Sequence, residues 1–596
     1  MTADRIVRIG GASGFWGDSS VGAPQLIGSG KVDYLVFDYL AELTMSLLAA
    51  ARMKNPALGY ATDFVSVTMR AVLREAMAKK LRIVSNAGGM NPRACAEAIA
   101  AIAEEQGLDL SIAVVTGDDV MGMIPQLRQQ GVREMQSGAA MPEKLVSANA
   151  YLGALPIARA LDAGAEIVVT GRCVDSALAL GVLVHEFAWS ATDHDRLAQG
   201  SLVGHILECG CQATGGLHTD WDQVPDWGNI GYPIAECRSD GSFILTKPAG
   251  TGGLVTPATV GEQLLYEIGD PARYVLPDVV CDFTQVTMAQ AGADAVAVSG
   301  ARGRPPTPCY KVSATFLDGY RSSAQLTIVG FDAAGKARRT AQAILERTRK
   351  IFSVHNFGDY TDTYIETIGA ESCYGPHARA QDAREVVMRL SVRHPSKDAL
   401  DIFAREIAAA GTSWSPGTTG AGGTGRPHAS PSIKQFAFLL EKRYVTPVVT
   451  IGTSEFAVEV PPGLAEEPAS LPEHGADSTV AQGGDMVEVP LVRIAYGRSG
   501  DKGDTSNIGL IARSAALLPV LRREVTERRV GEWLGHLVHG RIARYDLPGI
   551  GAVNFVCEGA LGGGGMASLR NDPLGKGMAQ ILLAMPVRVP RALLPD

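Results

Sequence analysis

The chain has 596 residues, of which 46% are hydrophobic and 20% charged, as in a globular protein with a large core. This length favours two or three domains over a single one. The sequence has no uninterrupted apolar run of about 18 residues, so no membrane span is predicted. The first residues lack the pattern of a secretory signal, and nine scattered cysteines form no regular disulfide framework. We therefore predict a cytoplasmic protein.

Five short apolar runs in the first 170 residues each end in small or polar residues, and a helical pattern follows each run. The runs span residues 5–11, 32–37, 81–84, 111–115 and 166–169. Alternating strands and helices are typical of a Rossmann-like, mostly parallel sheet. The loops that follow parallel strands open at one edge of the sheet, where ligands bind. The sequence therefore predicts one crevice at this edge for a small, anionic ligand.

The first of these loops follows the strand expected over residues 5–11 and is rich in glycine. Small residues let backbone N–H groups approach a phosphate closely. The spacing fits neither the dinucleotide fingerprint nor the P-loop, because G-x-G-x-x-G and Gly-Lys-Ser/Thr are both absent. We predict ligand contact here, with a tightly packed turn as the alternative. The candidate ligand-binding residues are Gly11, Ala12, Ser13, Gly14 and Asp18.

Three carboxylates are candidates for general acid–base catalysis. Asp38 and Glu42 stand four residues apart after the second strand, so on a helix they would share a face. Glu208 precedes Cys209 in a Gly-rich stretch. A carboxylate in an apolar crevice can donate or accept a proton in a reaction. The alternative for Asp38 and Glu42 is a role at a helix N-terminus, where acidic side chains stabilise the helix dipole.

The later loops of the predicted sheet supply further polar candidates. Asn91 is also a possible helix N-cap, because Pro92 follows it and helical stretches are expected over 92–106 and 151–163. The ligand-binding candidates in these loops are Asn86, Gly88, Gly89, Asn91, Thr116, Asp118, Asp119, Arg172 and Asp175.

The middle of the chain is less regular. Loops are expected over 203–260, a helix from 260, strands over 279–286, 311–316 and 324–329, and helices over 341–352 and 397–410. We predict a mixed or antiparallel layer here. A second Gly-rich loop is either an anion cradle or a plain turn, and its candidate residues are Lys247, Thr251, Gly252 and Gly253.

Four residues in this region superficially suggest zinc or a Cys–His nucleophile: His205, Cys209, Cys211 and His218. Their spacing matches no standard zinc frame, so buried thiols are the preferred interpretation and no metal site is predicted.

Residues 461–487 are rich in Pro, Glu, Ala, Ser and Gly, which is typical of a linker. Beyond it we predict a small α+β domain over 488–596, with a strand over 488–496, a helix over 506–518, a strand over 552–557 and a final helix over 576–584. From residue 490 onward this tail carries a net charge of +5, against −14 for the rest of the chain. Neither charge is large enough to indicate nucleic-acid binding.

The predicted tail contains a loop over 498–507 that mixes both charges, hydroxyl groups and two glycines, as binding loops do. Asp501 and Asp504 are conceivable Mg²⁺ ligands, although acidic loop residues usually bind no metal. We expect this loop to close over the crevice, with Lys502 touching an anionic ligand group. The candidate residues are Ser499, Asp501, Lys502, Asp504 and Asn507.

Several long motifs resemble the acyclic terpene utilisation (AtuA) family over about residues 5–455. They are Ile9–Asp18, Asp33–Glu42, Asn86–Pro92, Gly171-Arg172 with Asp175, Glu208-Cys-Gly with Thr214-Gly-Gly216, and Lys247-Pro with Gly252-Gly253. The tail, with Arg498–Gly509, resembles the ferredoxin-like domain associated with that family.

The resemblance implies a role in degrading acyclic terpenoid acids and branched acyl-CoA compounds. We therefore expect a cytoplasmic, homo-oligomeric enzyme that carries out a hydro-lyase or lyase step on an acyl-CoA thioester. Coenzyme A would enter as part of the substrate, and no other cofactor is predicted. The expected body spans 1–460, with subdomains over about 1–200 and 201–460. The alternative is a non-catalytic binding or assembly subunit of an acyl-CoA carboxylase pathway.

Overall fold

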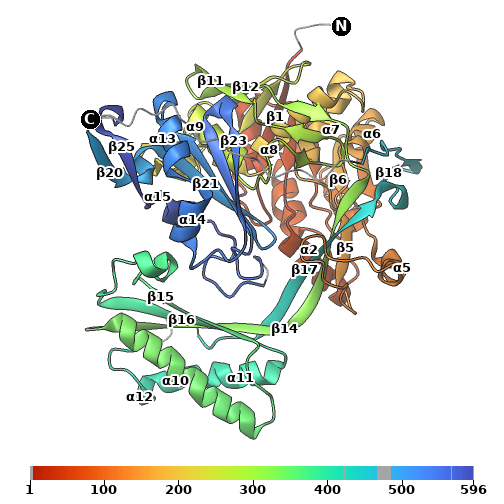
Figure 1. Cartoon of the computed structure of the whole chain (residues 1–596). Helices are drawn as coiled ribbons and strands as arrows, with labels where there is room; N and C mark the ends of the chain where they lie inside the picture. The colour runs from red at the N-terminus through yellow and green to blue at the C-terminus, as the bar shows by residue number, and fades with distance from the viewer. Residues whose placement is uncertain (1–4, 420–424, 466–484, 566, 595–596) are drawn as a thin grey trace.

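The computed structural model describes residues 5–419, 425–465, 485–565 and 567–594, shown in Figure 1. The centre of the body is a sheet of five parallel strands: β1 (Val7–Ser13), β2 (Tyr34–Phe37), β3 (Arg82–Ser85), β6 (Ile167–Thr170) and β4 (Ile112–Thr116). They lie side by side in the order β1-β2-β3-β6-β4. These are the five strands expected from the sequence, and the predicted α/β fold class is confirmed.

Antiparallel strands extend this core on both sides to give an 11-stranded mixed sheet. β7 (Ile234–Cys237), β8 (Phe243–Thr246), β12 (Ala295–Ser299) and β11 (Thr287–Gly292) continue it beyond β1. β18 (Val448–Ile451) and β19 (Ser454–Ala457) continue it beyond β4. The sequence did not predict β7 and β8, because four-residue strands between Gly-rich loops carry little periodicity.

Helices cover both faces of the parallel strands, which is why these strands are apolar on both sides. Leu35 and Ile83 pack on the face covered by α1 (Gly22–Ser29), α3 (Arg70–Ala78) and α4 (Pro92–Glu105). Val36 and Val84 pack on the face covered by α6 (Leu155–Asp162), α7 (Ala177–Phe187) and α8 (His194–Leu207). The predicted cap of α4 is confirmed, since Asn91 accepts a hydrogen bond from the backbone N–H of Ala94 and Pro92 follows it.

Three further helices and a small sheet complete the body. α2 (Glu42–Lys54) follows β2, α5 (Ile124–Gln129) follows β4, and α9 (Pro257–Leu265) follows β8. A small antiparallel sheet of β9 (Tyr274–Val275), β10 (Val280–Asp282) and β13 (Arg302–Arg304) lies beyond α9 in the chain. Only part of the strand predicted over 279–286 forms.

A second unit, which we call the arm, projects from the body (Figure 1). Its main strand, β14 (Cys309–Val329), has 21 residues and joins the two strands predicted separately within it. β14 pairs with β5 (Ser147–Ala150), β17 (Ser430–Glu441) and β16 (Glu385–His394), and β16 pairs with β15 (Asp362–Ile368). α10 (Ala333–Val354), α11 (Lys397–Glu406) and α12 (Ala410–Ser413) lie on the side of this sheet away from the body.

The tail forms a four-stranded sheet in the order β21-β22-β24-β23, where β21 is Ala495–Lys502, β22 Thr505–Ala512, β24 Ala552–Cys557 and β23 Ile542–Leu547. α13 (Leu518–Glu524), α14 (Glu527–Leu534) and α15 (Met578–Leu583) pack against it, and β20 (Met486–Pro490) pairs with β25 (Pro586–Pro590). The ferredoxin-like expectation is confirmed. The linker predicted over 461–487 lies largely outside the described residues.

Two tail predictions differ from the structure. The strand expected over 488–496 is interrupted by the 3₁₀ turn Leu491–Arg493 between β20 and β21. Residues 506–518 begin with a strand, β22, and not with a helix. β21 and β22 form a hairpin whose turn is made by Gly503 with a positive φ of 63°. The side chains of β22 are buried on both faces, so the strand lacks the alternation that would have identified it. The predicted polar loop over 498–507 is therefore mostly the end of this hairpin.

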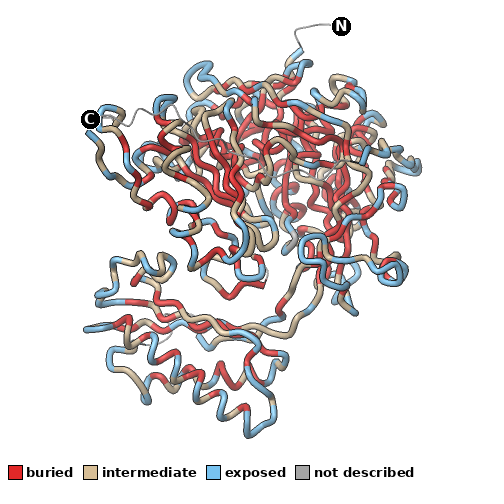
Figure 2. The backbone as a smooth tube through the Cα atoms, viewed as in Figure 1, coloured by how far each residue is buried: buried red, intermediate tan, exposed pale blue. Residues whose placement is uncertain are grey.

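The tail has its own apolar core and also packs on the body (Figure 2). Leu265 of α9 joins Ile511, Leu547 and Ala552 of the tail in one buried cluster. Arg513 donates two hydrogen bonds to the carboxylate of Asp220, at 2.7 and 2.6 Å. The positive tail thus meets the negative body through paired charges as well as apolar contact.

Candidate functional site

The first part of the candidate site lies where β1, β2 and β3 end. Asn86, after β3, donates from Nδ2 to Oδ1 of Asp38, after β2, at 2.7 Å. The Oδ1 of Asn86 accepts the backbone N–H of Tyr39 at 2.8 Å, and Ser13 Oγ donates to the Asp38 carbonyl at 3.2 Å. Asp38, Asn86 and Ser13 are all buried. Three predicted residues from three separate loops therefore meet, as expected for parallel strands.

The second part is Glu208, at the C-terminal end of α8. Its Oε1 lies 2.9 Å from Nδ1 of His205, one helical turn earlier. The other ring nitrogen of His205 lies 3.0 Å from the carbonyl of Leu264, so Nε2 carries a hydrogen and donates it there. Nδ1 is then the ring nitrogen that faces the Glu208 carboxyl, within ion-pair distance. His205 is fully buried, which protects this pair from water.

A small cavity of about 10 Å³ joins the two parts, with room for about one water molecule. Asp38, Asp175 and Glu208 line it together with Ser13 from β1. Apolar and small side chains complete the wall: Val36, Leu178, Ala179, Gly204 and Leu207. The structure thus places two of the three predicted catalytic carboxylates, Asp38 and Glu208, around one space.

A third group extends the site along the sheet edge. The Nη1 of Arg172 donates to Oδ1 of Asp175 at 2.7 Å, and its guanidinium lies 4.1 Å from the centre of the Tyr151 ring. The backbone N–H of Arg172 donates to Oδ2 of Asp118 at 2.9 Å. Asn149, on β5, donates to the same Asp118 oxygen at 2.8 Å. Gly171 allows this approach, since a Cβ there would lie 2.4 Å from Asp118 Oδ1.

Burial favours the protonated form of the carboxyl groups in this site. Burial raises the pKa of Asp38 well above its usual range, and the charge of Asp175 raises it further, while the hydrogen bond from Asn86 opposes the shift. Burial likewise raises the pKa of Glu208, opposed by His205, and raises the pKa of Asp118 to about 6. The site therefore holds carboxyl groups that keep their protons more tightly than exposed carboxyl groups do, as groups that act as general acids commonly do.

The charge of Glu208 also acts on His205. Burial alone would lower the pKa of His205, but the facing Glu208 carboxyl outweighs burial and raises it. A proton between these two groups is thus retained by the pair, and either group can hold it. This arrangement allows a proton to pass between Glu208 and a bound molecule while His205 compensates the charge.

The Gly-rich first loop packs tightly against the body. A Cβ on Gly14 would lie 2.7 Å from the backbone of Cys209, so glycine is required where β1 meets the end of α8. The backbone N–H groups of Gly11 and Gly14 already donate to the Pro233 carbonyl and to Asp18 Oδ2. Asp18 also accepts a hydrogen bond from the hydroxyl of Tyr232. This loop positions β1 and α8, and its predicted contact with a ligand stays a prediction.

Of the other candidate residues in the predicted loops, some lie in the site and others belong to the surrounding structure. Asn91 caps α4 and Asp119 is exposed, with its carboxylate accepting the backbone N–H of Met121. Thr116 is the last residue of β4. The N–H of Gly89 donates to the Asn86 carbonyl, which closes the turn that also contains Gly88. Glu42 begins α2, and its side chain lies outside the described residues.

The second Gly-rich loop, after β8, forms a turn held by its own residues. Lys247 Nζ lies 3.0 Å from Asp294 Oδ2 and donates to the carbonyl of Thr251. The hydroxyl of Thr251 donates to the carbonyl of Pro248. Gly252 and Gly253 continue the turn. The positive charge of Lys247 is thus already paired, and of the two interpretations these contacts match the turn.

The tail hairpin brings Lys502 toward the site from the other side. Lys502 Nζ lies 3.9 Å from Oε2 of Glu267, and its charge lowers the pKa of both His205 and Glu208. Its side chain is 45% exposed, so it remains accessible to a ligand. The expected contact of Lys502 with an anionic group stays a prediction.

The remaining tail candidates hold the tail together or attach it to the body. Asn507 donates to the carbonyl of Leu265 and accepts the N–H of Glu267. Ser499 donates to the carbonyl of Gly575 at 2.7 Å. Asp504 Oδ1 accepts the N–H groups of Leu561 and Gly563, and Asp501 lies 3.4 Å from Lys576.

The four residues that suggested zinc do not form one cluster of ligands. His205 faces Glu208, and Nδ1 of His218 lies 2.7 Å from Oε2 of Glu262. All nine cysteines are free thiols. Across the described ranges, no group of three or more His, Cys, Asp or Glu side chains is arranged to hold a metal ion. Nor does any described helix combine the length and apolarity needed to cross a membrane.

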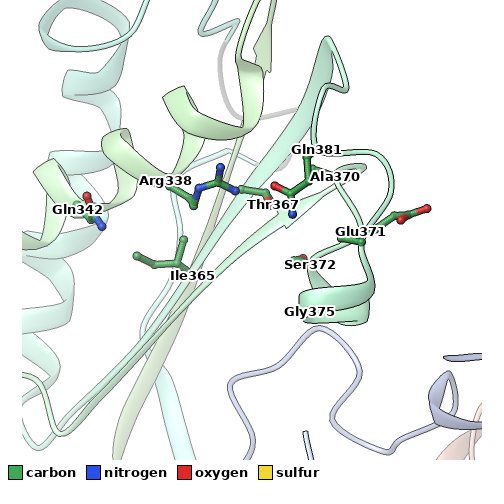
Figure 3. Close-up of a pocket in the computed structure, with 10 residues that line it drawn as sticks. Arg338, Gln342, Ile365, Thr367, Ala370, Glu371, Ser372, Gly375 and Gln381 are labelled. Carbon is green, nitrogen blue, oxygen red and sulfur yellow. The ribbon is translucent and has the colours of Figure 1, made fainter. Parts of the chain in front are cut away.

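A larger cavity of about 210 Å³ lies in the arm, between α10, β15 and the 3₁₀ turn Ser372–His377 (Figure 3). Arg338, Thr367 and Gln381 are among the side chains that line it. None of the residues predicted from the sequence lies there. Asp38, Asp118 and Glu208, which are buried and have raised pKa values, lie at the edge of the body sheet, so we place the candidate site at that edge.

The sequence did not identify His205 as the partner of Glu208, nor Asn149 as a hydrogen-bond donor to Asp118. The i,i+3 spacing of His205 and Glu208 was the available signal, since such pairs are neighbours on a helix. Asn149 carried no signal, because β5 approaches Asp118 only through its pairing with β14.

The fold and site together define an α/β protein with a crevice of buried, protonatable carboxyl groups, completed by a ferredoxin-like tail. Comparison with protein families agrees with this description. The family described as acyclic terpene utilisation family protein AtuA matches residues 7–451, and the AtuA ferredoxin-like domain matches residues 489–588. The chain belongs to the AtuA family, which supports a role in terpene catabolism. No curated protein and no solved structure matches the chain.

Proposed function

We propose that this protein is an enzyme that carries out a hydro-lyase or lyase step on an acyl-CoA thioester with a branched or isoprenoid acyl chain. The observation that carries the proposal is the pair of buried carboxyl groups, Asp38 and Glu208, on the wall of one small cavity. Adding or removing water across a carbon–carbon double bond requires one group that donates a proton and one that accepts a proton.

The two groups differ in the way this reaction requires. Asp38 is held by Asn86, and burial raises its pKa well above the usual range, which favours the protonated form. Glu208 faces His205, which can take up or return the proton that Glu208 exchanges with a substrate. We assign Asp38 as the proton donor and Glu208 as the proton acceptor in the direction of hydration. Two carboxyl groups in unequal surroundings commonly divide acid and base roles in this way.

A water molecule in the cavity would be the second reactant. The cavity has room for about one water and is lined by Asp38, Asp175 and Glu208, which offer it hydrogen bonds. The substrate itself needs more space, so we propose that the loops around Asp38 open to admit it. Coenzyme A enters as part of the substrate and no further cofactor is required by this scheme.

The test is to incubate the purified full-length chain with a panel of branched and isoprenoid acyl-CoA thioesters, saturated and unsaturated. Mass spectrometry of the products would detect the gain or loss of one water molecule, or of a fragment of the acyl chain. Turnover supports the enzyme. Tight binding to an acyl-CoA carboxylase without turnover of any thioester supports the assembly subunit instead, and light scattering in the same experiment tests the proposed homo-oligomer.

A further inference from the structure

The arm cavity of about 210 Å³ is lined by residues at regular spacing on a helix and a strand. Arg338 and Gln342 stand one turn apart on α10, and Ile365 and Thr367 stand two residues apart on β15. Residues at i and i+4 share a face of a helix, and residues at i and i+2 share a face of a strand. The helix and the strand therefore each direct one row of side chains into the same space (Figure 3).

The third wall of the cavity contains the turn Ser372–His377, and the tail holds this turn in place. The ring of His377 stacks on that of Trp533 in α14, with 3.6 Å between the ring centres. His536 Nε2 lies 2.8 Å from the carbonyl of Cys373. Because the tail fixes this wall, the cavity is already formed before a ligand arrives, which lowers the cost of binding.

Three polar side chains of the cavity have hydrogen-bonding groups that the protein leaves unused. Thr367 is only 4% exposed, yet its hydroxyl has no hydrogen-bond partner in the part of the chain that the structure describes. Within the same described residues, the guanidinium of Arg338 and the amide of Gln381 also lack a partner, and both side chains are exposed. Figure 3 shows these three side chains directed toward one another. Buried hydroxyl groups normally bond to protein, water or a ligand, so the cavity offers a bound molecule one buried group and two more accessible donors.

The charge of the cavity suits a ligand with a single negative charge. Among the residues that line it, Arg338 is the one cation and Glu371 the one acid. The Glu371 carboxylate points away from Arg338 (Figure 3), and its Oε2 accepts the backbone N–H of Arg379. A carboxylate accepts two N–H groups of a guanidinium in bidentate geometry, and one guanidinium balances its charge. A phosphate monoester carries a charge of about −1.5 to −2 at neutral pH, more than Arg338 alone balances.

The size and the apolar part of the cavity limit the rest of the ligand. Ile365, Ala370 and Ala378 supply hydrocarbon surface beside the polar groups. The volume of about 210 Å³ is below the roughly 300–1,000 Å³ of pockets that hold drug-sized ligands. The space therefore suits a short hydrocarbon chain next to an anionic group.

We propose that the arm cavity binds a small monocarboxylate with a short hydrocarbon chain. The carboxylate pairs with the guanidinium of Arg338 and accepts hydrogen bonds from Thr367 and Gln381, while the chain lies against Ile365 and the two alanines. None of the crevice carboxyl groups lines this cavity, so the proposal does not depend on the reaction proposed for the crevice.

The test follows the binding of isovalerate, a short branched carboxylate, to the full chain by ligand-observed NMR titration. Isovaleramide is its uncharged counterpart of nearly the same shape. We expect the acid to bind about 10-fold more tightly than the amide, because only the carboxylate forms charge-assisted hydrogen bonds with Arg338. Arg338→Gln should weaken binding of the acid by about 10-fold or more. Thr367→Val keeps the shape of the buried side chain but removes its hydroxyl, and should weaken binding by about 3- to 10-fold.

Arg339→Gln is the matched control, because Arg339 is the next residue of α10, is exposed and does not line the cavity. It removes the same charge from the same helix and should leave the affinity for isovalerate unchanged. Circular dichroism establishes that each variant is folded. The proposal is overturned if isovalerate shows no saturable binding, if isovaleramide binds as tightly, or if folded Arg338→Gln binds isovalerate as the native chain does. It is also overturned if inorganic phosphate binds more tightly than isovalerate, because the cavity would then prefer a phosphate.

Discussion

Replacing Asp38 by Asn tests the acid–base assignment with little change of shape. The carboxyl Oδ1 accepts hydrogen bonds from Asn86 Nδ2 at 2.7 Å and from the backbone N–H of Leu40 at 3.3 Å. An Asn side chain can present its own Oδ1 to both donors. Because burial raises the pKa of Asp38 well above its usual range and so favours the neutral carboxyl, an uncharged Asn side chain resembles the favoured form. We therefore expect the free energy of unfolding to change by less than about 1 kcal/mol.

The effect on catalysis should be much larger than the effect on stability. Loss of a positioned proton donor typically costs about 10²- to 10⁴-fold in rate, or about 3–5 kcal/mol of transition-state stabilisation. The assay compares kcat on the most reactive acyl-CoA thioester with the urea midpoint of the same preparation. Asp33→Asn is the matched control, since Asp33 precedes the same strand at its opposite end, where its Oδ2 accepts the backbone N–H of Arg8 at 2.8 Å. It should leave kcat unchanged.

Asn86→Ala separates positioning from chemistry. It leaves the buried N–H of Tyr39 without its acceptor and removes the donor to Asp38, so we expect a loss of about 2–4 kcal/mol in the free energy of unfolding. The assignment of Asp38 as the proton donor is refuted if Asp38→Asn retains full activity on every substrate that the native protein turns over. It is also refuted if Asp38→Asn unfolds as readily as Asn86→Ala, because the carboxyl would then be needed as an anion for folding.

The remaining predictions concern pH and the tail interface. The pKa of Asp118 is about 6 in the folded chain, above the unfolded value of about 3.9, so the folded state holds its proton more tightly. Stability from this group is present at low pH and falls by about 2 kcal/mol as pH rises from 4 to 7; urea titrations of Asp118→Asn should lack this decline. Arg513→Ala leaves Asp220 unpaired at the interface and should cost about 1–3 kcal/mol, seen as faster hydrogen exchange in the tail strands. Asn507→Ala should accelerate the same exchange, whereas an unchanged rate in both variants would show that apolar contact alone holds the tail.

The parallel core and part of the site followed from the sequence for one physical reason. A strand buried on both faces gives a continuous apolar run, and the residue after it must lie at the edge of the sheet. Ser13, Asp38 and Asn86 each follow such a run, so their meeting was predictable. Glu208 was identified as a candidate because it precedes Cys209 in a Gly-rich stretch, but its partner His205 was interpreted with the cysteines.

The parts that could not be predicted depend on contacts between distant segments. β14 is a single strand because it pairs with β5 near one end and with β16 near the other, and no local pattern records this. β22 was mistaken for a helix because its two faces pack against α15 and α9, which removed the alternation.

Buried carboxyl groups that ionise lower the stability of the fold, so their position indicates where the functional site lies. Asp38, Glu208 and Asp118 all have raised pKa values, and each destabilises the fold at neutral pH to the extent that it ionises. Asp278 is buried with a raised pKa too, but it accepts the N–H of Ala154 and is stabilised by the charge of Lys442. These contacts give Asp278 a structural role, so its burial needs no bound ligand to explain it. Asp38, Glu208 and Asp118 instead gather near the ends of the parallel strands, and Asp38 and Glu208 line one cavity. Stability alone does not favour this arrangement, whereas proton transfer does.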